Sequence, residues 1–478
     1  MTIKLYNSMT RQKEDFVPGE PGKVKMYVCG PTTYNFIHLG NARPLIVFDT
    51  IRRYFSYKGY QVTYVQNFTD IDDKIINRAQ EEKMDPLDLA QKYIGEYFKD
   101  AQALGVLAAD LHPKVSEHIP DVIEMISTLI DKGFAYAISG DVYFAVDRFE
   151  EYGKLSGREL EDMQAGARVG VDERKRNPMD FALWKSAKPG EPAWESPWGP
   201  GRPGWHIECS AMSLKYLGAE FDIHGGGFDL IFPHHENEIA QSEAYCGRPF
   251  AKYWMHNGFI TVNEEKMSKS LGNFFTVREI LSKYAPEVVR FYMLSTHYRS
   301  PLDFDDSKLE MNKRSLERLH NTLDNLSAVL KNKPAEESSG VGIAEFNQTI
   351  AGAREKFEEA MDDDFNTALA IATFFDLARD INSFIAKQDK MGQAAFQALA
   401  LGKETMEALG QVLGLFQEQE FPQVDDGLTD GLMQLILEIR ADSRAKKDWG
   451  TADKIRDTLN QLGVVIEDTA QGPRWKRK

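Results

Sequence analysis

Cysteine is scarce in this sequence, with three residues among 478, at positions 29, 209 and 246. Their number is odd and the positions are far apart, so the sequence predicts no disulfide framework. Free thiols of this kind are typical of a reducing compartment, where they remain available to bind metal. We therefore expect a cytoplasmic location.

Long apolar runs are missing as well. The segment Met1 to Glu14 alternates between polar and apolar residues, which excludes the continuous apolar stretch of a secretory signal. No segment approaches the roughly twenty apolar residues that span a bilayer, so no membrane partner is expected. The composition, 42% hydrophobic and 27% charged, is typical of a globular protein. A chain of 478 residues is expected to form about three domains.

Positive charge is in deficit. The sequence holds 57 Lys and Arg against 73 Asp and Glu, a formal net charge of −16, whereas contacts to phosphates need Lys and Arg. Basic residues nevertheless gather near the C-terminus, where Arg440 to Lys478 include ten Lys or Arg against six Asp or Glu. A solvated basic tail would have the same composition, so this segment permits RNA binding without demonstrating it.

A strand, turn, helix, strand pattern begins near residue 24. Val24 to Cys29 alternate like a strand and stop at Gly30-Pro31. Apolar residues at helical spacing follow from about Asn41 to Tyr57, and Gln61 to Phe68 form a second strand. This βαβ unit predicts an α/β fold with a parallel sheet, and it puts residues 29–41 at the carboxyl edge, where such sheets bind ligands.

The later chain changes character twice. Residues from about 115 to 200 interrupt the pattern with a strand at Asp141 to Val146, which indicates an insertion. The sheet is expected to resume at Trp205 to Met212 and again at Phe221 to His224. After Ser307 the pattern becomes helical, with the leucine stripe of a packed bundle at Leu316, Leu319, Leu323, Leu326 and Leu330. Further helices are expected from about 343 to 416, then a linker at 422–431 and a small basic unit.

The segment between the first strand and helix could hold a phosphate, because a helix N-terminus exposes unpaired N–H groups and a partial positive charge. His38 could donate to a phosphate oxygen, and Gly40 would let a nucleotide approach the backbone. Taken alone, a His-x-Gly triplet is common, and a turn histidine would be preferred. A second motif, rich in lysine, favours the phosphate site over the turn histidine. Lys266 and Lys269, in Lys-Met-Ser-Lys-Ser, suit a polyphosphate whose negative charge grows as it is displaced.

A metal site is a third candidate. His234 and Glu238 are four residues apart, so on a helix they would face one direction at about 5–6 Å. Together with Cys29 and Cys209 they would form a donor set that suits zinc. Spacing alone does not select these ligands, since they come from three distant segments and a buried cysteine is often only a small hydrophobe. The competing ligands are His235, Glu236 and Glu243.

The His-x-Gly and lysine motifs together resemble the HIGH and KMSKS signatures of class I aminoacyl-tRNA synthetases. The last residue of the first motif is Asn41 here, which can donate a hydrogen bond but carries no charge, so positioning is expected of it. Longer stretches are similar to the cysteinyl-tRNA synthetase family, in which Asn is usual at this place. The similar stretches are residues 30–32, 37–41, 69–74, 204–210 and 224–238, within a similarity that runs from about 24 to 300 and more loosely to the C-terminus.

The resemblance implies an architecture and a reaction. A Rossmann-type catalytic domain, in two halves at 1–114 and 204–306, would enclose a connective insertion at 115–203. A helical bundle at 307–420 and a small anticodon-binding unit at 430–478 would follow. The implied reaction activates cysteine with ATP and Mg²⁺ and transfers it to tRNA(Cys). A monomer is expected.

The resemblance also implies roles for individual residues. One Zn²⁺ per chain would be held by Cys29, Cys209, His234 and Glu238, and it would bind the substrate thiol. The catalytic group would be His38, Asn41, Lys266 and Lys269. Nucleotide contacts would come from Gly40, Asp229 and Lys269, and substrate contacts from Thr69 and Trp205. Asp229 could contact either the ribose or the substrate ammonium, and Trp205 could equally be a core aromatic. Cys246 has no matching role and is expected to be structural.

One further stretch of the sequence resembles the family, and two other functions compete with the implied reaction. Residues 363–367, Asp-Asp-Phe-Asn-Thr, look like the family's, although a capped helix start would explain them. A ligase that joins activated cysteine to a small amine, such as the cysteine–sugar ligase of mycothiol synthesis, should lack the C-terminal unit that Ala452 to Trp475 occupy here. A zinc-dependent regulatory or RNA-binding protein without catalysis is disfavoured by the intact lysine motif.

Overall fold

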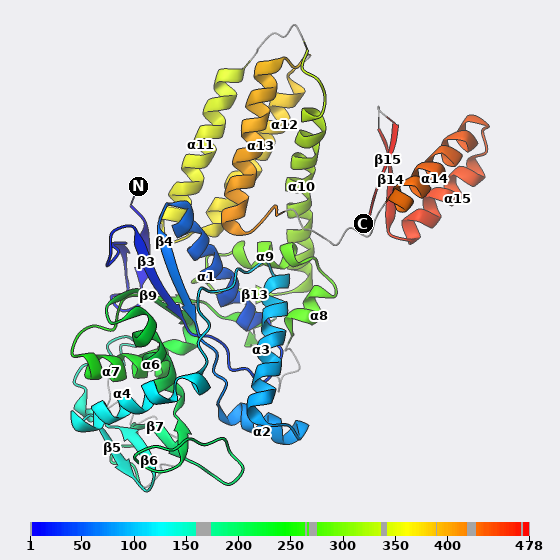
Figure 1. Cartoon of the computed structure of the whole chain (residues 1–478). Helices are drawn as coiled ribbons and strands as arrows, with labels where there is room; N and C mark the ends of the chain where they lie inside the picture. The colour runs from blue at the N-terminus through cyan, green and yellow to red at the C-terminus, as the bar shows by residue number, and fades with distance from the viewer. Residues whose placement is uncertain are drawn as a thin grey trace. The chain divides into compact units, whose positions relative to one another are not determined.

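The computed structural model describes residues 2–158, 174–262, 265–266, 275–335, 342–388, 390–417, 427–469 and 472–477. The chain divides into two compact units, Met1–Gln417 and Glu418–Lys478. The larger unit contains every element from β1 to α13 (Figure 1).

A four-stranded parallel sheet is the centre of the larger unit, in the order β10-β9-β3-β4. In this sheet Met26 pairs with Tyr64 on one side and with Ile223 on the other. The sheet therefore joins strands from before and after the predicted insertion, and the predicted α/β class is confirmed. The strands are β3 (Lys23–Val28), β4 (Gln61–Gln66), β9 (Phe221–Gly227) and β10 (Ala251–Asn257).

Helix α1 (Leu39–Tyr57) connects β3 to β4, as the sequence predicts, and buries Leu45, Phe48, Ile51 and Phe55 in the same core as the sheet. Asp residues cap the next two helices, where a side-chain oxygen accepts from a first-turn N–H group. The elements around this unit are β1 (Lys4–Asn7), β2 (Gln12–Asp15), α2 (Asp73–Glu82) and α3 (Pro86–Ala103).

The insertion forms a separate antiparallel sheet in the order β5-β6-β7-β8. Together with α6 and α7 it lies at the lower end of the larger unit in Figure 1. The elements at this end of the larger unit, of which α6 and α7 follow the insertion, are α4 (Ile119–Asp131), β5 (Ala135–Ile138), β6 (Asp141–Phe144), β7 (Phe181–Ser186), β8 (Gly201–Pro203), α6 (Trp205–Leu217) and α7 (Glu236–Cys246).

The prediction of a strand at Trp205 to Met212 is wrong, because these residues open helix α6. Residues Ile207 to Ser213 of this helix are all buried, including Glu208 and Cys209. A helix buried on several sides shows no polar stripe with the period of 3.6 residues from which a surface helix is recognised. Its ends are marked by Gly204 and by Gly218, which has a φ of 77°.

A small sheet in the order β12-β11-β13 carries the first residue of the lysine motif. In it Lys266 pairs with Thr261, and Thr261 pairs with Asp303. The elements of this region are β11 (Ile260–Val262), β12 (Glu265–Lys266), α8 (Val277–Leu281), α9 (Pro286–Leu294) and β13 (Leu302–Phe304).

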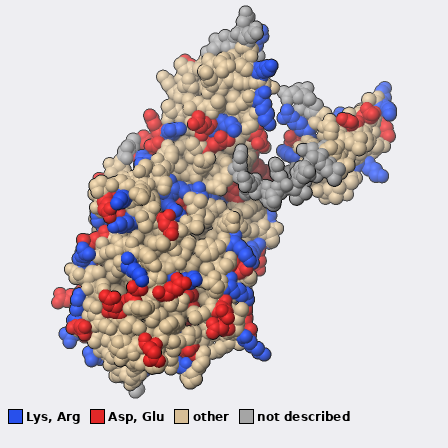
Figure 2. Space-filling model, in the orientation of Figure 1, with Lys and Arg blue, Asp and Glu red and all other residues tan. Residues whose placement is uncertain are grey.

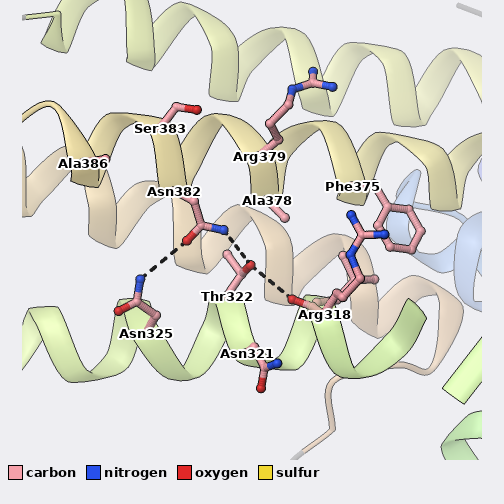
Figure 3. Close-up of a pocket in the computed structure, with 11 residues that line it drawn as sticks. Arg318, Asn321, Thr322, Asn325, Phe375, Ala378, Arg379, Asn382, Ser383 and Ala386 are labelled. Atoms are coloured by element: carbon pink, nitrogen blue, oxygen red, sulfur yellow. Dashed lines mark hydrogen bonds between the residues drawn. The ribbon is translucent and has the colours of Figure 1, made fainter. Parts of the chain in front are cut away.

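Four long helices form the predicted bundle, and the first four leucines of the predicted stripe are buried in it. An open groove of about 770 Å³ lies between α10 and α12, with polar side chains along its floor (Figure 3). There the amide of Asn382 donates to the hydroxyl of Thr322 over 3.0 Å. None of the described helices combines the length and the apolar character needed to cross a membrane. The helices are α10 (Asp306–Leu330), α11 (Ile343–Asp362), α12 (Thr367–Ala386) and α13 (Gln393–Leu413).

The smaller unit packs two helices against a hairpin. The sequence predicts a linker up to residue 431, but α14 already begins at Gly427, so the end of that prediction is wrong. The first turn of a helix accepts Gly and Asp, since its N–H groups have no partners within the helix. The elements are α14 (Gly427–Ala445), α15 (Trp449–Gln461), β14 (Val464–Thr469) and β15 (Gly472–Arg477).

Charges of both signs are interspersed on the face of the protein drawn in Figure 2. A deeply buried ion pair joins Arg290 of α9 to Asp49 of α1, and each side chain is 1% exposed. The Arg290 guanidinium also donates to the carbonyls of Leu413 (2.6 Å) and Gly105 (3.3 Å). This pair therefore ties helix α1, which packs on the central sheet, to the end of α13 in the bundle.

We expect Asp49→Ala to destabilise the protein by about 3–5 kcal/mol, because it leaves the Arg290 charge buried and unpaired. Urea unfolding would measure the loss. Glu20→Ala is the control, since Glu20 forms exposed pairs with Lys23 and Lys25 that are expected to contribute little. Equal unfolding midpoints for the two variants would contradict the assignment.

Candidate functional site

A cavity of about 310 Å³ opens where three parallel strands end. Its wall includes Cys29 after β3, Asp229 after β9 and Gly258 after β10. The carboxyl edge of a parallel sheet is the expected place for a ligand. Six of the predicted site residues line this cavity: Cys29, His38, Gly40, Asn41, Trp205 and Asp229.

The turn after β3 requires glycine at position 30. A Cβ atom there would lie 1.6 Å from the backbone oxygen of Asn67. The Gly30 N–H donates to the side chain of Asn67 over 2.9 Å. This close passage of two backbones fixes the direction in which Cys29 enters the cavity wall.

His38 stands at the N-terminus of α1 with extended backbone. Its N–H donates to the side-chain oxygen of Asn41 over 3.2 Å, so Asn41 caps the helix start as well as lining the cavity. The Leu39 N–H donates to the Phe275 carbonyl (3.2 Å), and the Val277 N–H donates to the Ile37 carbonyl (3.0 Å). The chain that follows the lysine motif is thereby held against the start of α1.

The lysine motif is only partly described. The backbone of Lys266 lies on β12, and Lys269 lies outside the described residues. The catalytic roles of the two lysines stay predictions.

The four predicted metal ligands converge. One ligand atom from each of Cys29, Cys209, His234 and Glu238 lies within 4.8 Å of every other. The two sulfur atoms are 3.8 Å apart, and the His234 Nε2 atom is 3.0 Å from the Glu238 carboxylate. The ligands come from the end of β3, from α6 and from the start of α7. Only the folded chain brings these segments together.

Metal ligands must be deprotonated, and two of these four groups already favour that state, whereas the other two hold their protons. The hydrogen bond from Cys29 lowers the pKa of Cys209 to about 6, while burial raises the pKa of Cys29. Burial by itself would raise the pKa of Glu238, but His224 and His234 lower it well below its ordinary value. Burial likewise opposes a proton on His234, but the Glu238 charge raises its pKa to about 10. Cys209 and Glu238 are thus the negatively charged donors, and a metal ion would replace the protons on Cys29 and His234.

A second set of donors overlaps the first. Cys29 and Glu238 also lie within 4.8 Å of His224 and His235. His224 is 2.8 Å from Glu238, and His235 is 3.4 Å from the Cys29 sulfur. Sequence reasoning considered His235 only as a competitor and did not consider His224, although it stands in the His-Gly-Gly-Gly stretch. Burial lowers the pKa of His235, so it is a neutral neighbour of the group.

The other two competing ligands are engaged elsewhere. The carboxylate of Glu236 accepts from the N–H groups of Gly153 (3.0 Å) and Ser156 (2.7 Å). The carboxylate of Glu243 pairs with Lys154. Both acidic side chains therefore stabilise residues 153–156, which lie between β6 and β7 of the insertion.

The two predicted substrate contacts differ in position. Trp205 is 41% exposed, its ring centroid lies 4.3 Å from that of His234, and it lines the cavity, so it is not a core aromatic. Thr69 is buried, and its hydroxyl donates to Glu208 over 3.0 Å. The structure thus puts Thr69 in the interior beside the cavity wall. One residue that sequence reasoning missed is Lys74, which lines the cavity and lies over the ring of Tyr34.

Comparison with known proteins identifies the families that three parts of the chain match. Residues 15–314 match the family of class I (C) tRNA synthetase catalytic domains. Residues 356–417 match the DALR domain family, and residues 425–475 match the cysteinyl-tRNA ligase anticodon binding domain.

Full-length relatives are also similar. The cysteine–tRNA ligase of Desulforamulus reducens is 63% identical, and that of Pelotomaculum thermopropionicum is 62% identical, each over 100% of both chains. Among solved structures, Mycobacterium tuberculosis methionyl-tRNA synthetase shares the fold at 17% identity with a TM-score of 0.61, covering 82% of this chain and 89% of that one. The chain belongs to the cysteine–tRNA ligase family.

Proposed function

We propose that this chain joins cysteine to tRNA(Cys) in two steps within the cavity at the sheet edge. The observation that supports this most directly is that Cys29 and His38 line one cavity. Cys29 is one of the four clustered candidate metal ligands. His38 stands at the N-terminus of α1, a place suited to bind phosphate. An amino acid that carries a thiol and a nucleotide could therefore be held side by side.

The donor group fits zinc. Two thiols, one imidazole and one carboxylate within 4.8 Å of one another are the ligand types that zinc prefers. Zinc, when bound, supplies a Lewis acid that coordinates and deprotonates the thiol of cysteine far more readily than the hydroxyl of serine. We assign one ion per chain to Cys29, Cys209, His234 and Glu238. Trp205 packs over His234 and would shield this end of the cavity from water.

The nucleotide end follows from the signature residues. A carboxylate oxygen of cysteine attacks the α-phosphorus of ATP, supplied with Mg²⁺, and the bond to pyrophosphate breaks. The N-terminus of α1 and His38 hold the phosphates, and Lys266 and Lys269 neutralise the departing pyrophosphate. Gly40 allows close approach of the nucleotide, Asn41 keeps the helix start in place, and Asp229 binds the ribose or the substrate ammonium. A ribose hydroxyl of the tRNA then attacks the acyl carbon, and AMP leaves.

The proposed domains are a catalytic domain in two halves (1–114 and 204–306), an insertion (115–203), a bundle (307–420) and an anticodon-binding unit (430–478). The insertion strands β5 to β8 pair with one another, which supports the partition. We propose that the protein is a monomer. Its three cysteines are free, in keeping with the cytoplasm.

The zinc assignment predicts about one zinc per chain in the pure protein. Cys209→Ser and His234→Ala should lose the metal, because each removes a ligand. His235→Gln should keep it, since His235 belongs to the second donor set. Cys246→Ser serves as the control outside both sets. Metal analysis would decide, and zinc retained by Cys209→Ser but lost from His235→Gln would favour the second set instead.

Amino-acid selectivity gives the test of the function itself. Pyrophosphate exchange should proceed with cysteine and be lower by at least about 10⁴-fold with serine, the ratio typical of sites built around one polar contact. With a purely apolar pocket, the exchange rates for cysteine and serine would differ by only about a hundredfold. Serine activation within that range, or exchange with neither amino acid, would overturn the proposal.

The lysine motif gives a separate test. Lys269→Ala should slow pyrophosphate exchange by about 10²–10³-fold, the usual loss for one preorganised donor to a developing charge. Zinc content should remain that of the wild-type protein, because the lysine is distant in sequence from the donor group. An unchanged exchange rate would make this motif a solvated loop.

A further inference from the structure

The turn between α11 and α12 contains residues of the stretch 363–367, which resembles the cysteinyl-tRNA synthetase family. The proposed reaction assigns no role to this stretch. Asp364 and Phe365 both have left-handed backbone, with φ of 63° and 50°, in two consecutive residues that are not glycine. Such a conformation is unfavourable and persists only where surrounding contacts hold it. The helix cap does not explain it, because the cap of α12 is Asn366, which accepts from the Leu369 N–H over 3.1 Å.

The contacts that hold the turn converge on the carboxylate of Asp364, which is 0% exposed. It accepts from the Tyr298 hydroxyl (2.8 Å) and from Arg299 Nε (2.7 Å). His297 lies 3.5 Å away, and the Tyr6 N–H donates over 2.8 Å. Three of the four partners are consecutive residues of the loop between α9 and β13, here called the 297–300 loop.

The backbone of the 297–300 loop faces the cavity wall. The Gly258 N–H donates to the Tyr298 carbonyl over 2.8 Å. The fully buried guanidinium of Arg43 donates to Gly258 (2.9 Å) and Phe259 (2.7 Å) on one side and to Ser300 (2.5 Å) on the other. A Cβ atom at Gly258 would lie 2.5 Å from the Ser300 oxygen, so wall and loop cannot move independently.

The same loop also leads to the lysine motif. It runs directly into β13, where Asp303 pairs with Thr261 of β11, and Thr261 pairs in turn with Lys266 of β12. The Thr261 hydroxyl donates to the Asp303 side chain over 2.8 Å. A displacement of the loop would therefore move both Gly258 in the cavity wall and the strand that carries Lys266.

We infer that Asp364, a residue of the helical bundle, is a positioning residue for the nucleotide end of the cavity. It fixes the side chains of the 297–300 loop, and the loop's backbone fixes the wall and the base of the lysine motif. The inference rests on the proposed function only in that ATP is bound beside His38 and the lysine motif. The cysteine end, formed by Cys29, Cys209 and His234, has no contact with this loop among those described.

The test is the steady-state kinetics of pyrophosphate exchange by full-length Asp364→Asn. Asparagine keeps the size of the side chain but offers an NH₂ group where one carboxylate oxygen accepts hydrogen bonds. KM for ATP should rise by about ten- to a hundredfold, the effect of a small misplacement of a binding wall. KM for cysteine and the zinc content should stay within about twofold of the wild type.

Tyr54→Phe is the matched control. It removes a buried hydrogen bond of 2.6 Å between α1 and Asp362 of α11, so it weakens the same interface without touching the 297–300 loop. Its KM for ATP should equal that of the wild type. Tyr298→Phe, which removes one donor to Asp364, should raise KM for ATP to an intermediate value and serves if Asp364→Asn does not fold.

Different outcomes would contradict the positioning role of Asp364 and the proposed function. Unchanged KM for ATP in Asp364→Asn or in Tyr298→Phe, or an equal rise in Tyr54→Phe, would overturn the positioning role. So would a parallel rise in KM for cysteine. Absence of cysteine-dependent exchange in the wild type would instead count against the proposed function.

Discussion

The carboxylate of Glu238 is fully buried, and a buried charge is stable only when it is paired and hydrogen-bonded. Its partners are His224 (2.8 Å), His234 (3.0 Å) and Cys29 (3.4 Å). These groups stand on β9, at the start of α7 and at the end of β3, on both sides of the insertion. Neutralising one carboxylate thus requires that β3 and β9 be neighbours, which is the pairing at the centre of the sheet. Fold and site depend on the same contacts.

Polar side chains along helix α1 contact both the cavity wall and the elements next to it. Its N-terminus lines the cavity at Gly40 and Asn41, and Arg43 holds the cavity wall. Asp49 binds Arg290 of α9, and Tyr54 binds Asp362 of α11 over 2.6 Å. Arg43, Asp49 and Tyr54 are each buried, so removing any one of them leaves a polar partner unsatisfied in the interior. One helix thereby contacts the cavity at its N-terminus and α9 and α11 further along its length.

Local patterns predict the local parts of this structure. The alternation at 24–29 predicts β3, and the leucine stripe predicts α10. Each pattern is local, because it repeats with the period of the strand or helix that it forms. The same reasoning fails at α6, where burial on several sides removes the periodic signal. The convergence of the metal ligands could not be predicted from spacing, since it depends on tertiary pairing, and the expectation rested on resemblance. His224 and the role inferred for Asp364 likewise emerge only from contacts between distant segments.

Two glycines show how the ends of the cavity differ physically. At Gly30 a Cβ atom would meet the Asn67 backbone at 1.6 Å, and at Gly258 it would meet the Ser300 backbone at 2.5 Å. Both are places where two backbones pass in contact, so neither neighbour can yield by a change of rotamer. Gly30 adjoins Cys29 and the donor group, whereas Gly258 adjoins Arg43 and the 297–300 loop. Strain at the first site would therefore displace Cys29, and strain at the second would displace the cavity wall at Gly258. The two walls of the cavity are thus held by close backbone contacts with different segments of the chain.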